Sequence, residues 1–334
     1  MTRFENARHC AGVFVSTVCC LLGILVSGCA LIIPQTEEMR LNRPAGLAPI
    51  AELTDVPFFP QKDYQCGPAA LATSLAHFGA AVTPEDLVSQ VYLPARQGSL
   101  QVEMLASARR NGMVAYQLAP RFADMLREIA AGFPVILLQD YGVWPFSIWH
   151  YAVAVGYDMN EGDLVLRSGE KRRLLIPFAV LEYTWKESDY WAMVTVPPDR
   201  IPVTATEPLY LKAVVALEHT GNKPAARTAY AAMLARWPES LGAGIGLANM
   251  YYAHGDLKQA ETVLRRLVET HPDAAVAYNN LAQTILDEGR AAEALPLAER
   301  AVALGGPYAG AARETLEAVT RRIRESPPAQ PQGR

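Results

Sequence analysis

One cysteine, Cys66, carries the clearest chemical signal in the sequence. It stands directly before Gly67-Pro68, and proline suits the first turn of a helix. Apolar residues follow at helical spacing, at positions 71, 75 and 78, so Cys66 is expected at a helix start. Unpaired amides and the positive end of the helix dipole stabilise a thiolate there. The pattern predicts a lowered thiol pKa and a nucleophile, and the alternative is a cysteine that only begins a helix.

A cysteine nucleophile needs a base, and histidine is the side chain that suits this role near neutral pH. Residues 51–198, the expected catalytic domain, contain His77 and His150. His77 follows Cys66 by eleven residues on one helix, roughly 16 Å away at 1.5 Å per residue, which is too far for a hydrogen bond. His150 begins the strand-like run 150–156 and is therefore predicted to be the base. The alternative is a histidine that merely begins a buried strand.

Helical patterns come first in residues 51–198, and strand-like patterns follow. A helix is expected from residue 66, and others over 84–92, 99–111 and 122–131. Strands are expected over 134–138, 151–157, 164–166 and 190–196. This order predicts an α+β domain.

Beyond Pro197-Pro198 the sequence becomes rich in alanine and repeats itself. Glycines recur every 34 residues at 221, 255 and 289, and alanines recur at 226, 260 and 294. The period and its small and bulky positions resemble the tetratricopeptide repeat. The resemblance implies an all-α solenoid over 205–325, with three repeats and a capping helix over 307–324. A tail rich in proline and glutamine, 326–334, is expected to be disordered.

The first 33 residues are typical of export. Arg3 and Arg8 precede an apolar run over 11–26, and Val26-Ser27-Gly28-Cys29 closes it. These four residues resemble the bacterial lipobox, which implies a signal peptide over 1–28, a lipid on Cys29 and a tether over 29–50. The expected location is the outer membrane, facing the periplasm. An uncleaved anchor helix over 11–33 is the alternative.

The use of cysteine supports the catalytic interpretation of Cys66. The chain has five cysteines. Cys10, Cys19 and Cys20 would leave with the signal, and Cys29 would carry lipid. Cys66 would then be the only free thiol of an exported protein, with no partner for a disulfide.

The blocks around Cys66 and His150 resemble the papain-like double-glycine leader peptidases. They are Gln61 with Cys66-Gly67-Pro68, then Gly132-Phe133-Pro134-Val135-Ile136, then Trp149-His150-Tyr151. The resemblance implies a papain-like α+β cysteine peptidase over 51–198. It also implies that Cys66 is the nucleophile, His150 the base and Gln61 a donor to the oxyanion.

Two positions depart from that family. Gln61 stands five residues before the cysteine, where papain-like enzymes often have six, and Gln65 is a weaker substitute. The family expects Asp or Asn near the end of the strand after His150, and Ser168 falls closest to that place. A serine accepts the imidazole proton but stabilises an imidazolium poorly. Other candidates for the third position are Asp158, Asp163 and Glu170.

Together these features predict an envelope lipoprotein that hydrolyses a peptide or amide bond through a thioester on Cys66. The repeats would bind a protein partner or the substrate. The alternative is a scaffold lipoprotein with weak or no catalysis. A net charge of −4 without a long basic run does not indicate a nucleic-acid partner. No spacing of histidines and carboxylates suggests a metal site, and no cofactor is expected.

Overall fold

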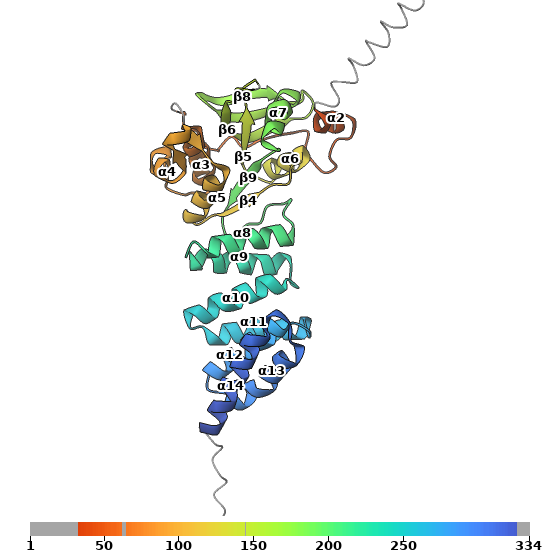
Figure 1. The fold of residues 1–334 in the computed structure, drawn as a ribbon. Helices are drawn as coiled ribbons and strands as arrows, with labels where there is room; N and C mark the ends of the chain where they lie inside the picture. The colour runs from red at the N-terminus through yellow and green to blue at the C-terminus, as the bar shows by residue number, and fades with distance from the viewer. Residues whose placement is uncertain (1–32, 62–64, 144, 326–334) are drawn as a thin grey trace, which may run out of the picture. The chain divides into compact units, whose positions relative to one another are not determined.

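The structure, a computed structural model, describes residues 33–61, 65–143 and 145–325 (Figure 1). The expected signal segment, Cys29 and the tail 326–334 lie outside the described residues. The chain divides into two compact units. The first takes the residues up to Ser107, Gln117–Thr195 and Pro202–Thr204. The second takes Ala108–Tyr116, Val196–Ile201 and the residues from Ala205 onward.

A seven-stranded sheet has the strand order β4-β9-β5-β6-β7-β8, with β1 paired to β6. Its strands are β1 (Ile50–Glu52), β4 (Val114–Gln117), β5 (Val135–Asp140), β6 (Trp149–Asp158), β7 (Asp163–Ser168), β8 (Lys171–Pro177) and β9 (Ala192–Val196). The neighbours β5 and β6, β6 and β7, and β7 and β8 are antiparallel. A two-stranded sheet of β2 (Tyr92–Leu93) and β3 (Gly98–Ser99) stands apart.

Helices α3, α4 and α5 gather on one side of the strands, and α2, α6 and α7 on the other (Figure 1). Their bounds are α2 (Pro34–Leu41), α3 (Cys66–His77), α4 (Pro84–Val91), α5 (Gln101–Arg110), α6 (Phe122–Ala130) and α7 (Phe178–Trp185). Every residue of α3 from Gly67 to Leu75 is buried, so this helix forms part of the core. The side chain of Thr83 begins α4 by accepting from the Asp86 amide. The mixed fold with an antiparallel sheet is confirmed.

Part of the segment 29–50, which is expected to be a tether, forms helix α2. The buried carboxylate of Glu182 accepts from the backbone amides of Gln35 (2.9 Å) and Thr36 (2.6 Å) at the start of α2. The Gln35 side chain in turn accepts from the Phe122 amide, at 2.6 Å, at the start of α6. These long-range contacts hold a segment whose own sequence pattern is weak.

The sequence also failed to indicate β4, β8 and α7, and it placed several ends one or two residues away from those observed. Strand β8 has a mostly exposed face and carries Lys171, Arg172 and Arg173, so it lacks the apolar alternation on which strand prediction depends. Strand β4 is four residues long. Its pairing across the sheet, rather than its own pattern, makes it a strand.

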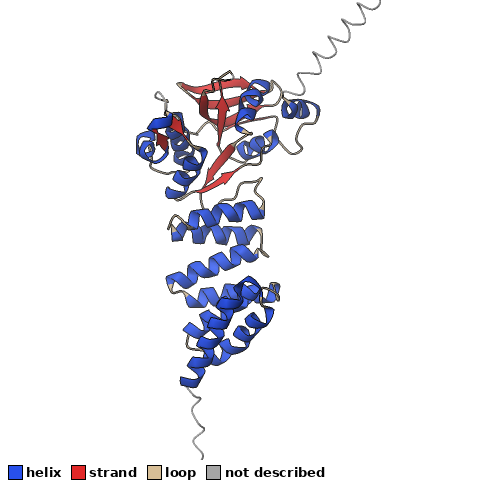
Figure 2. Ribbon diagram, viewed as in Figure 1, coloured by secondary structure: helices blue, strands red, loops and turns tan. Residues whose placement is uncertain are grey.

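The second unit is a run of paired helices (Figure 2). These are α8 (Glu207–Glu218), α9 (Lys223–Arg236), α10 (Leu241–His254), α11 (Leu257–Thr270), α12 (Ala275–Asp287), α13 (Ala291–Leu304) and α14 (Ala309–Glu325). Gly221, Gly255 and Gly289 each have φ between 81° and 86°, which an L side chain rarely adopts. The periodic glycines therefore end the first helix of each pair, and the expected helical repeats are confirmed.

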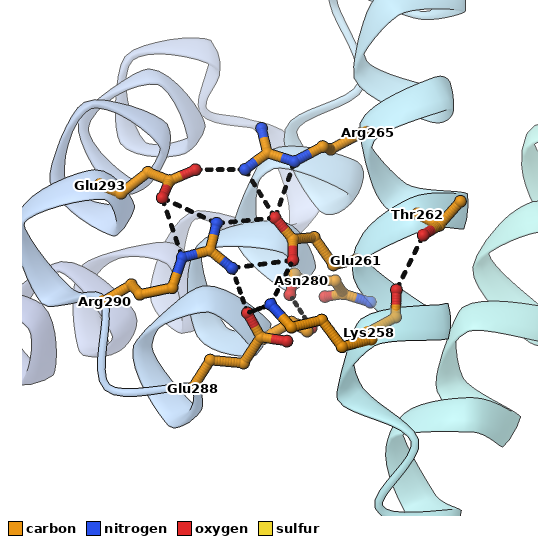
Figure 3. A network of polar contacts seen from close by, with 9 residues as sticks. Lys258, Glu261, Thr262, Arg265, Asn280, Glu288, Arg290 and Glu293 are labelled. Carbon is orange, nitrogen blue, oxygen red and sulfur yellow. Dashed lines mark hydrogen bonds and ion pairs between the residues drawn. The ribbon is translucent and has the colours of Figure 1, made fainter.

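Neighbouring repeats are joined by polar contacts in addition to apolar packing. Glu261 of α11 accepts from both terminal nitrogens of Arg290, at 2.8 Å each, and from Nε of Arg265 at 2.8 Å (Figure 3). Glu293 pairs with both arginines. Within residues 33–61, 65–143 and 145–325, no helix combines the length and apolar character needed to cross a membrane.

Candidate active site

Cys66 is the first residue of α3 and lies on a cleft of about 820 Å³. Gln61 and His150 line the same cleft. Gly67 explains how the helix start fits there, because a Cβ at this position would lie 2.3 Å from the Ser99 hydroxyl oxygen. A side chain at position 67 would push the start of α3 away from the cleft wall.

Burial raises the pKa of the Cys66 thiol. Contacts with the backbone amides of Tyr151, Gly67 and Cys66 itself oppose this effect but do not overcome it. The direction is opposite to the expectation from the helix start alone, because desolvation of the thiolate exceeds its stabilisation by amides. The resting cysteine is therefore a thiol.

His150 is the second residue of β6 and lies opposite Gln139 of β5 in the sheet. Its Nε2 is 2.8 Å from the Ser168 hydroxyl. Burial lowers the pKa of the imidazole to about 4, so the ring is neutral at neutral pH. The Tyr141 ring stacks on it, with 5.1 Å between the ring centroids and 24° between their planes. The imidazole is therefore held by a hydrogen bond at its edge and by an aromatic ring stacked on its face.

Ser168, at the end of β7, stands where a third catalytic residue is expected, and it is buried. The carboxylates considered as alternatives lie elsewhere. Asp158 accepts from the amides of the β6–β7 turn, and Asp163 is at the opposite end of β7 from Ser168. Glu170 is exposed. Among the described residues, the imidazole of His150 therefore has a neutral hydroxyl, that of Ser168, as its hydrogen-bond partner.

The Gln61 side chain is held by two backbone groups. Its Oε1 accepts from the Gly169 amide at 3.0 Å, and its Nε2 donates to the Tyr151 carbonyl at 3.3 Å. A carboxamide nitrogen carries two protons, so one remains for a ligand in the cleft. Gln65, the other glutamine considered, directly precedes α3 and is not a lining residue of the described cleft.

His77 lies away from this site, as its spacing from Cys66 predicts. Its Nε2 is 3.2 Å from the Gly132 carbonyl oxygen, and its Nδ1 is 3.9 Å from the Asp55 carboxylate. No cluster of three or more histidine, cysteine or carboxylate side chains suited to a metal occurs in the part of the chain that the structure describes.

Sequence reasoning missed Tyr141. It follows β5 in the loop that leads to β6, and no periodicity marks it. A signal existed only in the pairing of the strands, because Tyr141 donates its backbone amide to Ile148 and so lies beside the start of β6. The same loop presents exposed apolar side chains, among them Val143, Phe146 and Ile148.

Comparison with known proteins agrees with this arrangement. Residues 53–169 match the Peptidase_C39 like family, and residues 220–284 and 274–305 match two tetratricopeptide repeat families. No match was found among the curated proteins.

Two solved structures are similar to the first unit. One, a protein described as a C39-like peptidase from Bacillus anthracis, is 18% identical over 44% of this chain and 97% of its own, with a TM-score of 0.38. The other is the peptidase domain of Streptococcus ComA, a bi-functional ABC transporter involved in a quorum sensing pathway. It is 20% identical over 42% of this chain and 98% of its own, with a TM-score of 0.35. By the family matches, this chain joins a C39-like peptidase domain to tetratricopeptide repeats.

Proposed function

We propose that the protein is a cysteine hydrolase that cleaves a peptide or amide bond through a thioester on Cys66. The observation that carries the proposal is the meeting of Cys66, His150 and Gln61 on one cleft, with Ser168 bonded to the imidazole. These are the parts that acyl transfer requires: a nucleophile, a base with an orienting partner, and a donor for the oxyanion.

The reaction begins from a neutral pair. His150 takes the thiol proton as Sγ of Cys66 attacks the carbonyl carbon, and the imidazolium then gives that proton to the leaving amine. The negative charge on the carbonyl oxygen is stabilised by the free N–H of Gln61 and by the amides at the start of α3. Water then attacks the thioester with the same histidine as base, which releases the acid and restores the thiol.

The repeats serve, in this proposal, to hold a protein partner or a polypeptide substrate. Tetratricopeptide repeats generally mediate protein interactions, and three repeats with a capping helix form a continuous stack. We further propose that a lipid on Cys29 anchors the protein in the cell envelope, at the outer membrane and facing the periplasm. The lipobox-like residues 26–29 support this part of the proposal.

A second candidate function is a binding scaffold with little or no catalysis. The observation that favours it is the partner of the His150 imidazole among the described residues, which is a serine and not a carboxylate, together with an imidazole pKa lowered to about 4 by burial. An imidazole with a pKa this low binds a proton weakly, so it is a poor general base.

Alkylation of Cys66 by iodoacetamide, followed on the Cys66-containing peptide by mass spectrometry, separates the two functions. If His150 is a base for the thiol, then His150→Ala slows alkylation at neutral pH. His254→Ala, which changes an exposed histidine of α10, leaves the rate unchanged. Equal rates in the wild-type chain and both variants would favour the scaffold.

Turnover is tested with a mixture of peptides of known sequence and mass. New product masses are expected with the wild-type chain and not with Cys66→Ala. The same products from Cys66→Ala would remove Cys66 from the mechanism.

A further inference from the structure

Part of the cleft beside Cys66 is lined by apolar side chains that the proposed mechanism does not use. We call this part the apolar wall, and its members are Leu100, Leu138, Ile148 and Trp149. Leu138 is nearly buried, whereas Ile148 is 61% exposed and Trp149 is 49% exposed. A ligand side chain that covered the wall would therefore remove apolar surface from water.

The sheet brings two members of the apolar wall to one face. Side chains alternate along a strand, so Trp149 and Tyr151 of β6 point to the same face. Strands β5 and β6 are antiparallel, and Leu138 lies opposite Tyr151 in their register. Leu138 is therefore the diagonal neighbour of Trp149 on the face that lines the cleft. Leu100, between β3 and α5, adds to the wall from a distant segment.

Hydrogen bonds at the start of β6 hold the exposed half of the apolar wall in place. Oδ1 of Asp140 accepts from the Ile148 amide at 2.7 Å and from the Gly142 amide at 2.8 Å. The Tyr141 amide donates to the Ile148 carbonyl oxygen at 2.9 Å. Asp140 lies opposite Trp149 in the sheet, but this carboxylate oxygen is engaged with the backbone. A wall fixed in this way loses little freedom when a ligand covers it.

Charged side chains also line the cleft, but they lie in water. Arg96, Glu187 and Asp189 are all exposed. They carry charges of both signs, and exposed charges are screened and pair weakly with a ligand. The surface of the cleft that can favour one neutral side chain over another is therefore the apolar wall.

We propose that the apolar wall is a specificity site for a large aliphatic or aromatic side chain of the polypeptide that Cys66 attacks. The inference rests on the proposed function and names its substrate class. The wall and Cys66 share one cleft of about 820 Å³, so a peptide that brings a carbonyl group to the sulfur brings its neighbouring side chains along the wall. Such a preference differs from that of the double-glycine peptidases, whose name records a substrate without side chains.

Binding at the apolar wall can be measured without cleavage, as protection of Cys66 against iodoacetamide in the full chain. Mass spectrometry of the Cys66-containing peptide gives the rate of alkylation. Three blocked pentapeptides are compared, with phenylalanine, lysine or glycine between two glycines on each side. The phenylalanine peptide is expected to protect at a roughly tenfold lower concentration than the other two, because it buries an aromatic side chain against the wall.

Three variants show whether the apolar wall is the cause of this preference. Trp149→Asp places a charge in the wall, so the advantage of the phenylalanine peptide is expected to disappear. Ile148→Ala is expected to reduce that advantage. Leu175→Ala, the removal of a similar exposed side chain on β8, is expected to leave it unchanged. The ratio between peptides is compared within each variant, so a change in the reactivity of the thiol itself cancels.

Equal protection by the three peptides, or protection by none of them, would overturn the inference. So would an advantage of the phenylalanine peptide that persists in Trp149→Asp. Alkylation that slows as the concentration of the chain itself rises would assign the wall to a second copy instead.

The inference and the proposed function fail in different ways. If the phenylalanine peptide protects Cys66 as expected but no Cys66-dependent products are found, the apolar binding site stands and the proposed hydrolysis fails. If products are found whose cleavage sites lie beside no large apolar residue, hydrolysis stands and the specificity site fails.

Discussion

The residue at position 168 decides the charge of the candidate site. With a serine rather than a carboxylate beside His150, burial lowers the pKa of the imidazole to about 4. Burial of Cys66 separately raises the pKa of its thiol. The thiolate expected from the sequence would need a lowered thiol pKa instead. The site is therefore better suited to a general base acting on a neutral thiol than to a preformed thiolate.

Ser168→Asp is expected to raise the pKa of His150 by about 1–3 units, because a carboxylate stabilises the imidazolium. The neutral imidazole is the base, so acceleration of Cys66 alkylation by His150 should begin near pH 4 in the wild-type chain and at higher pH in the variant. An NMR titration of His150 gives the pKa directly.

Ser168→Asn is the matched control, since its carboxamide oxygen accepts from Nε2 without adding charge. Its His150 pKa should stay near the wild-type value. A pKa that does not move in Ser168→Asp would mean that residue 168 does not set the charge of the site.

A site residue can be predicted from the sequence when a local pattern marks it, and not when its place depends on segments far apart along the chain. Cys66 and His150 can be named as candidates from the sequence because each is embedded in a local pattern, and Ser168 because it ends a strand that a turn predicts. Tyr141 and Gln139 could not be found in that way. Their place beside His150 depends on the register of β5 against β6, which the sequence does not state.

At the scale of elements, helix α2 depends on a residue 147 positions further along the chain. Glu182 is fully buried, and its carboxylate satisfies two of the unpaired amides at the start of α2. Such a cap is invisible in the local sequence, which is why residues 34–41 resembled a tether.

Glu182→Ala is expected to free α2, at a cost of about 1–3 kcal/mol, because two amides lose their acceptor. Hydrogen–deuterium exchange of residues 34–41 is the measurement, and faster exchange is expected there. Glu161→Gln alters an exposed carboxylate in the β6–β7 turn and should leave this exchange unchanged. Unchanged protection of α2 in Glu182→Ala would show that apolar contacts alone hold it.

The interface between the second and third repeats contains a charged group that is itself nearly buried. Glu261 is 8% exposed, and Arg290 and Arg265 hold the pKa of its carboxyl far below its usual range. A carboxyl with a lowered pKa stabilises the fold above its ordinary pKa, and the contribution is lost as the pH falls.

Arg290→Ala is therefore expected to destabilise helices α12–α14, since Glu261 loses its two-point partner and keeps Arg265. Hydrogen exchange in these helices is the readout, and Arg266→Ala, at an exposed residue of α11, is the control. Replacing both partners, with Glu261→Leu and Arg290→Met, should recover much of the loss. Equal protection in Arg290→Ala and Arg266→Ala would argue against a structural role for the pair.

At the scale of the whole molecule, one chain joins a candidate hydrolase to a stack of repeats, and the repeats were the easier part to predict. Each 34-residue unit buries small residues against its neighbours, and Ala226, Ala260 and Ala294 are all fully buried. The period of the structure is therefore also a period of the sequence. The sheet of the first unit offers no such repetition. Its strand order depends on pairings between distant segments, and short strands such as β4 escaped prediction.

At the scale of cellular location, we propose that a lipid on Cys29 holds the molecule at a membrane, and the alternative is an uncleaved anchor helix over 11–33. Only the first requires this thiol. When the full chain is produced in a Gram-negative bacterium and labelled with palmitate, the wild-type chain should carry label and Cys29→Ser should lose it. Cys20→Ser should keep the label, because position 20 lies in the expected signal peptide 1–28 and not at the expected lipid site. Membrane fractionation then distinguishes a lipid on Cys29 from an anchor helix. An unlabelled wild-type chain that remains in the membrane fraction, with its first 28 residues still present by mass, would establish the anchor helix instead.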